Sequence, residues 1–158
     1  MPPSIKNGNP IHHSLSPKLH NFWMKKNKIN GIYEKKLIIE DEIENLIEEI
    51  KINSLSGMNV TVPFKKSVIK FLDDLSPLAR ETQSVNTIYK EKNKIIGGNT
   101  DIGGFEASLK NINYNLNGKT VFILGAGGVV PSLIVALNQI TINIQKGDLF
   151  LYHRRCGT

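Results

Sequence analysis

The apolar residues of this chain recur with two different periods, and the period changes several times along the sequence. Residues 40–51, EDEIENLIEEIK, have the i, i+3, i+4, i+7 spacing of an amphipathic helix. The apolar face of that helix is formed by Ile43, Leu46, Ile47 and Ile50. Residues 31–39 and 58–62, on either side, have strand-type patterns. Strands that alternate with helices predict an α/β fold.

Three further elements are predicted within the first hundred residues. The segment SLSPKLHNFWMKKN begins a helix, with Ser16 as its N-cap and Pro17 at the first helical position. A short helix runs to about Leu72 after the strand 58–62. Residues 85–98, VNTIYKEKNKIIGG, form two strands around a polar turn and predict a β-hairpin.

A change of composition divides the chain. Residues 111–119, NINYNLNGK, are polar, rich in asparagine and contain Gly118, shortly before a continuous apolar strand. Such a stretch is typical of a domain boundary. We therefore predict one domain over residues 1–110 and a second over 111–158, the second long enough for one βαβ unit and little more.

The segment VFILGAGGVVPS is a buried-type strand that leads through Gly125, Gly127 and Gly128 into a helix. A glycine turn at this place lets backbone amides and the helix N-terminus approach a diphosphate closely. The pattern departs from G-x-G-x-x-G, because Pro131 and Ser132 follow where a third glycine or alanine would fall. The alternative interpretation is a tight strand-to-helix turn without a ligand.

The end of the next strand bears on the choice of cofactor. In dinucleotide-binding folds an acidic residue at this place selects NAD, whereas an arginine accommodates the 2′-phosphate of NADP. The segment YHRRCGT offers Arg154 and Arg155 and no acid. It favours NADP, although a basic tail without a ligand would look the same.

The strand in GMNVTVPFKK stops at Pro63 and is followed by Lys65 and Lys66. If a helix starts there, the ammonium group of Lys65 opposes the helix dipole, so local preference would place an acid at this position. Places that break local preference are often functional sites, and a lysine beside a carboxylate can transfer a proton. A solvated surface lysine is the alternative.

Asp101 is the candidate carboxylate. It follows two glycines in GGNTD and precedes a helix, where aspartate is also a common N-cap. Three further polar clusters, HSLS, NVT and SVNT, lie at strand or helix ends and suit a polyhydroxylated ligand, or are ordinary turns. The four histidines have no metal-ligand spacing, so no metal site is predicted.

The amino-acid composition limits which kinds of partner the protein is expected to bind. The net charge of +6 comes from 17 lysines and three arginines spread along the chain, which does not indicate a nucleic-acid surface but favours anionic small molecules. No segment has the roughly 20 apolar residues that span a bilayer, and the N-terminus lacks the apolar core of a signal peptide. With a single cysteine, Cys156, we expect a cytoplasmic protein without a membrane or nucleic-acid partner.

Five motifs occur in order along the chain: GNPIHHSLSPKLHN, GMNVTVPFK, SVNTIY, GGNTD and LGAGG. Their order and spacing resemble those of the shikimate dehydrogenase family, over residues 8 to about 138. The resemblance implies an N-terminal α/β substrate domain followed by an incomplete Rossmann-type nucleotide-binding domain, with the active site in the cleft between them. It implies reversible, NADPH-dependent reduction of 3-dehydroshikimate to shikimate, in aromatic amino acid biosynthesis.

The same resemblance assigns roles to individual residues. Lys65 and Asp101 would form the catalytic pair, in which the lysine passes a proton to or from the oxygen whose carbon exchanges hydride with the nicotinamide. The substrate would be bound by Ser14, Ser16, Asn59, Thr61, Lys65, Asn86 and Asp101. Ser14 and Ser16 would bind its carboxylate. NADP would be bound by Gly125, Ala126, Gly127, Gly128 and Arg154.

Two departures from the family pattern carry expectations of their own. Family members begin with an apolar strand, whereas PPSIKN contains Pro2 and Pro3, so the first strand is expected to be broken. The chain also ends after the second strand of the nucleotide domain, so we expect a truncated chain with an apolar patch around residues 121–124 and 133–137. A homodimer would cover that patch.

Two alternative functions stay open at this point. A quinate/shikimate dehydrogenase that uses NAD would differ mainly in the substrate pocket and the ribose site. A non-catalytic remnant would retain affinity for shikimate without turnover.

Overall fold

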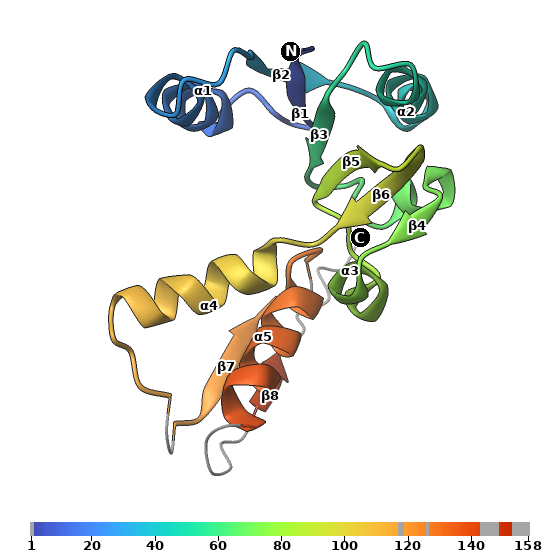
Figure 1. The fold of residues 1–158 in the computed structure, drawn as a ribbon. Coiled ribbons are helices and arrows are strands. Elements are labelled where there is room, and N and C mark those ends of the chain that lie inside the picture. Colours follow the sequence, from blue (N-terminus) through green and yellow to red (C-terminus); the bar gives the residue numbers. More distant parts are fainter. Residues whose placement is uncertain (1, 117–118, 126, 143–148, 153–158) are drawn as a thin grey trace. The chain divides into compact units, whose positions relative to one another are not determined.

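A computed structural model describes residues 2–116, 119–125, 127–142 and 149–152. The chain forms two compact units, Met1–Asn99 and Thr100–Thr158, each described by itself below. Both mix helices and strands, which confirms the α/β fold class (Figure 1). The helix Asp101–Asn111 (α4) belongs to the second unit, so the compact units divide earlier in the chain than residue 110. The functional domains 1–110 and 111–158 stay a prediction.

The first unit is built on one six-stranded sheet with the order β2-β1-β3-β5-β6-β4. Its strands are β1 (Ser4–Gly8), β2 (Tyr33–Leu37), β3 (Gly57–Val60), β4 (Asp74–Leu75), β5 (Thr87–Glu91) and β6 (Lys94–Gly98). Its α-helices are α1 (Ser16–Lys26), α2 (Ile43–Lys51) and α3 (Pro77–Thr82), with 3-10 helices at Glu40–Glu42 and Ser67–Phe71.

The three strands β1, β2 and β3 are parallel, with α1 and α2 as the crossovers between them. The strands β5 and β6 pair antiparallel as the expected hairpin, and β5 joins it to β3. Parallel strands end at the same edge of a sheet. The segments that follow β1 and β3 therefore leave from one edge; the first carries HSLS, and the second begins with Thr61 of NVT.

The core of the first unit lies between the sheet and α2. The four apolar residues predicted for this helix are each 1% exposed, which confirms the spacing argument: Ile43, Leu46, Ile47 and Ile50. They pack with Ile5 and Met58 of the sheet. Burial of each such side chain contributes about 1.5–3 kcal/mol. In Figure 1, α1 and α2 lie on opposite sides of the strands β1 and β3.

The first strand is intact, so the expectation that the two prolines break it is wrong. Pro2 and Pro3 precede the strand, where no ladder donor is needed, and the carbonyl oxygen of Pro3 accepts from the amide of Ser56 at 2.8 Å. The strand then pairs on both sides, from Ser4 onward. Ile5 lies in the core and anchors the strand there.

Helix α1 begins differently from the prediction. Its N-cap is Leu15, without a side-chain cap, and Ser16 is the first helical residue, so Ser16 is not the N-cap. The amide of Ser16 instead donates to Ser14 Oγ at 3.3 Å. None of the residues of α1 is buried, and its apolar residues Phe22 and Trp23 are exposed.

The second unit contains α4, β7 (Val121–Leu124), α5 (Val130–Ile142) and β8 (Leu149–Tyr152). The strands β7 and β8 are parallel, with α5 between them in the chain, which confirms the predicted βαβ unit. Its apolar cluster is centred on Leu116, Ile123 and Leu137. Among the described residues, no helix has the length and apolar character needed to cross a membrane.

Candidate active site

The predicted substrate residues of the first unit come from the loops that leave one edge of its sheet and from the middle of β3. Ser14 and Ser16 follow β1, and the amide of Ser14 donates to Ile11 O at 3.0 Å. Thr61 directly follows β3, and its amide donates to Asn7 O at 3.1 Å. The parallel pairing of β1 and β3 thus ties these two segments together.

Asn59 is the centre of a hydrogen-bond network. Its Oδ1 accepts from the hydroxyl of Tyr33 at 2.5 Å. Its Nδ2 donates to Asn86 O and to Thr87 Oγ1, both at 3.1 Å. Thr87 Oγ1 in turn donates to Asn86 Oδ1 at 2.9 Å. The structure therefore brings Asn59 and Asn86 together, while their binding of a substrate stays a prediction.

Asn86 is held by its backbone as well. Its amide donates to Gly98 O at 3.0 Å, and its carbonyl oxygen accepts from the amide of Val60 at 2.9 Å. The residue before it, Val85, donates its amide to Lys65 O at 2.8 Å. The Lys65 backbone is thus tied to the segment that carries Asn86.

The sequence suggested that Lys65 lies in the first turn of a helix, but the structure places it before the helix. It lies in a turn between β3 and the 3-10 helix Ser67–Phe71. The helix-dipole argument for this lysine is therefore wrong. Asp101 is the first residue of α4, in the second unit. Because the pair would join the two units, its assembly stays a prediction.

Three residues of this region were missed by the motif analysis: Lys6, His20 and Tyr33. The ring of His20 stacks on Tyr33, with centroids 4.1 Å apart and planes at 9°. Burial, together with the charge of Lys6, lowers the pKa of His20, and burial raises the pKa of Tyr33. Strand register places Tyr33 beside Ser4 and Lys6 beside Asn59, and the contact of His20 from α1 with Tyr33 comes from tertiary packing.

The glycine turn of the second unit has open space at two of its glycines, Gly125 and Gly127. Gly125 follows β7 directly and has φ of 114°, which favours glycine. A Cβ on Gly127 would meet no atom within 4 Å, so packing within the protein does not require glycine there. Such open space at a strand-to-helix turn lets a ligand approach the backbone and the N-terminus of α5. Gly128 lies in the same turn, while Ala126 and Arg154 lie outside the described residues.

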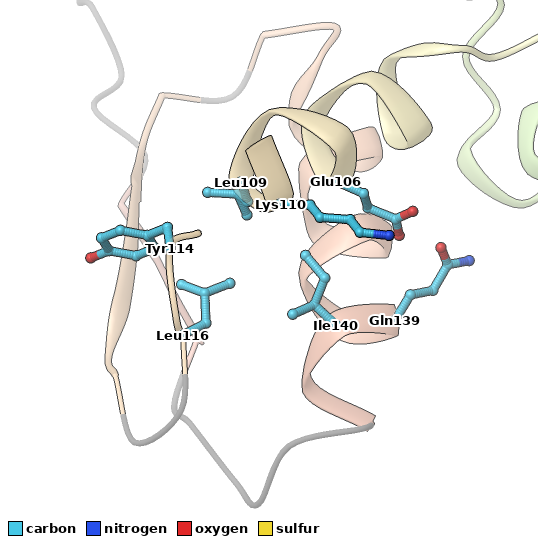
Figure 2. A pocket seen from close by; sticks show the side chains of 7 residues that line it. All are labelled: Glu106, Leu109, Lys110, Tyr114, Leu116, Gln139 and Ile140. Carbon is cyan, nitrogen blue, oxygen red and sulfur yellow. The ribbon is translucent and has the colours of Figure 1, made fainter. Parts of the chain in front are cut away.

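Each of the two units contains at least one cavity lined by its own residues. One of about 280 Å³ in the first unit is lined by residues of this network, among them His20, Tyr33, Asn59 and Thr87. Another, of about 510 Å³, lies in the second unit between the C-terminal part of α4 and α5 (Figure 2). Its lining contains none of the residues predicted to bind NADP. Among the described residues, no three acidic, histidine or cysteine side chains are grouped as a metal site.

Comparison with known proteins decides the family. Residues 7–88, just over half of the chain, match the family described as the shikimate dehydrogenase substrate binding domain. The chain belongs to the shikimate dehydrogenase family.

Relatives extend the match beyond this domain. The NADP(+) shikimate dehydrogenase of Pelagibacter ubique is 60% identical over 135 residues, which cover 85% of this chain and 51% of that protein. The enzyme of Clostridium beijerinckii is 40% identical over 130 residues, or 82% of this chain and 48% of that protein. The chain thus spans about half the length of the curated relatives that it matches.

Solved structures of the family show the same fold. Shikimate 5-dehydrogenase from Thermus thermophilus, in complex with NADP(H) and shikimate, is 29% identical with a TM-score of 0.86. That match covers 98% of this chain and 57% of the other. Shikimate dehydrogenase from Aquifex aeolicus also matches with a TM-score of 0.86, at 34% identity, over 98% of this chain and 56% of the other.

Proposed function

We propose that this chain carries the substrate site and part of the cofactor site of an NADP-dependent shikimate dehydrogenase, which reversibly reduces 3-dehydroshikimate to shikimate in aromatic amino acid biosynthesis. The observation that carries the proposal is the network that joins Asn59 to Asn86 within the family's substrate-binding domain. The relatives named as NADP(+) shikimate dehydrogenases support both substrate and cofactor.

The substrate is a ring that bears hydroxyls and a carboxylate, and the polar groups of the first unit suit it. The hydroxyls of Ser14 and Ser16 would donate to the carboxylate. The amides of Asn59 and Asn86 and the hydroxyl of Thr61 would bind the ring hydroxyls. Because these amides are held by neighbouring strands, they would be oriented before the substrate arrives.

Lys65 and Asp101 would move the proton. The lysine would donate to the carbonyl oxygen during reduction and accept the proton during oxidation, while Asp101 would orient the ammonium. Within the first unit, the carbonyl oxygen of Lys65 accepts from the amide of Val85 at 2.8 Å, and Asn99 Nδ2 donates to the adjacent Ser84 O at 3.0 Å.

The reduced cofactor, NADPH, would supply the hydride for the reduction, and NADP would accept it in the reverse reaction. The amides of the turn at Gly125, Gly127 and Gly128 would hold its diphosphate, with Ala126 as part of that turn and Arg154 as partner of the 2′-phosphate. The positive φ of Gly125 and the open space at Gly127 support this role. A cytoplasmic homodimer is the setting that we propose for the protein.

A calorimetric titration of the purified chain with shikimate tests the substrate site. We expect saturable binding, which should weaken in Asn86→Ala. The oxidation of shikimate in the presence of NADP, followed by the absorbance of the reduced nicotinamide, tests the reaction. Absence of shikimate binding would refute the proposed function for this chain.

A shikimate-binding module without turnover is the second candidate. The predicted substrate residues of the first unit are held by contacts within that unit: Ser14, Ser16, Asn59, Thr61, Asn86 and the backbone of Lys65. The chain also spans only about half of its curated relatives. Shikimate binding without NADP reduction would favour this module over the enzyme.

A further inference from the structure

Lys6 occupies an unusual place for a lysine. It lies in the middle of β1, which is paired on both sides by β2 and β3. Its partners in register are Lys35 and Asn59, and residues opposite one another in neighbouring strands share a face of the sheet. Lysine is depleted at such positions, where β-branched and aromatic side chains pack better. A local preference broken beside candidate site residues points to a function for this lysine.

The contact of Lys6 links it to the proposed carboxylate site. Its Nζ donates to Ser16 Oγ at 3.0 Å, and the contact is partly buried. Because Ser16 Oγ accepts from the ammonium, the hydroxyl hydrogen is left to donate to another group. Ser14 Oγ accepts from the Ser16 amide in the same way. Both hydroxyls thus keep their hydrogens available to donate to an acceptor such as a carboxylate.

The charge of Lys6 is not neutralised within the described part of the chain, where no carboxylate lies within 4.0 Å of its Nζ. An ammonium has three N–H donors, of which Ser16 takes one. Its neighbour Lys35 adds positive charge, with its own Nζ bonded to His12 O. A half-buried ammonium with spare donors, beside two hydroxyl donors, is a site for an anion.

We propose that Lys6 is a further substrate-binding residue, whose ammonium group contacts the carboxylate of the substrate together with Ser14 and Ser16. This inference rests on the proposed function, because the anion is the carboxylate of shikimate. A charge-assisted hydrogen bond is roughly twice as strong as a neutral one, so Lys6 would contribute more to binding than either serine alone.

Calorimetric titrations with shikimate and with its methyl ester test the role. Lys6→Met keeps the length of the side chain and removes the charge. We expect this variant to bind shikimate about tenfold more weakly, equivalent to about 1.4 kcal/mol. The methyl ester lacks the negative charge, so it should bind the wild-type and variant chains with the same affinity. Lys6→Arg, which keeps the charge, should retain most of the affinity.

The matched control is Lys36→Met. Lys36 lies on β2 in register with Asn7, on the other face of the sheet, and is exposed. Lys36→Met removes the same net charge as Lys6→Met, and we expect it to leave the affinity for shikimate unchanged. Lys6→Gln, a second neutral variant, guards against a folding defect in Lys6→Met, and thermal unfolding monitors the fold of each.

The outcomes separate the two proposals. If Lys6→Met loses about tenfold in affinity for shikimate and none for the ester, the contact between Lys6 and the carboxylate is supported. An equal loss for both ligands, or no loss for either, overturns the role of Lys6 while the proposed function stands. A wild-type chain that binds neither ligand overturns both.

Discussion

The hydroxyl of Tyr33 offers the most direct test of the site network. It donates to Asn59 Oδ1 at 2.5 Å, from a side chain only 4% exposed. Burial raises the pKa of Tyr33, so the hydroxyl stays protonated throughout the pH range of ordinary assays. Tyr33→Phe keeps the ring and its stacking on His20, and thus removes the hydrogen bond alone.

The loss of stability in Tyr33→Phe depends on Asn59 Oδ1, the acceptor that loses its donor. A neutral hydrogen bond contributes about 0.5–1.5 kcal/mol, and an acceptor left without a donor costs about 1–3 kcal/mol. Asn59 is half-buried, so water reduces this cost. We expect the free energy of unfolding of the first unit to fall by about 1–2 kcal/mol. Because the amide of Asn59 loses its fixed orientation, the dissociation constant for shikimate should rise about fivefold, or about 1 kcal/mol.

Urea denaturation followed by far-ultraviolet circular dichroism measures the first quantity, and calorimetric titration with shikimate measures the second. Tyr114→Phe, an exposed tyrosine in the second unit, is the control and should change neither. If Tyr33→Phe unfolds and binds like the wild-type chain, the hydrogen bond to Asn59 does not orient the site, and the reasoning fails.

Three other predictions test the fold around the site. In Gly57→Ala the new Cβ would lie 2.7 Å from Ile88 O across the β3–β5 pair. The free energy of unfolding should therefore fall by about 1–3 kcal/mol, which lowers the urea midpoint. An unchanged midpoint contradicts this prediction. Asn7 Oδ1 is buried without a hydrogen-bond partner among the described residues, so Asn7→Leu should add about 1 kcal/mol, whereas a lower midpoint would reveal a hidden partner. The pKa of His20, read from its ring-proton shifts, should lie below 6.5. Since folding lowers that pKa, protonation of His20 opposes folding. The free energy of unfolding should therefore fall as the pH drops from above 6.5 toward the folded-state pKa. His20→Gln should lack this pH dependence, and an equal slope in both proteins argues against a role of His20.

Much of the architecture could be predicted because it depends on short-range patterns. The helix face from Ile43 to Ile50, the hairpin of β5 and β6 and the strand-turn-helix at Gly125 each follow from periodicity or from glycine within one segment. The motifs that carry Asn59 and Asn86 could be singled out in the same way. Local patterns fail where long-range pairing decides, and two predictions were wrong for this reason. Strand β1 forms despite its prolines because β2 and β3 pair with it, and Lys65 lies in a turn that Val85 holds from another segment.

By itself, the sequence of this protein determined the alternation of strands and helices, the apolar face of α2 and the family to which its motifs belong. The tertiary structure alone decided which side chains meet: Tyr33 with Asn59, and Lys6 with Ser16. The reason is physical. The period of a strand says which residues share a face. Only the register between strands, favoured by burial of Ile5, Met58 and Ile88 with α2, says which residues of distant segments lie opposite one another.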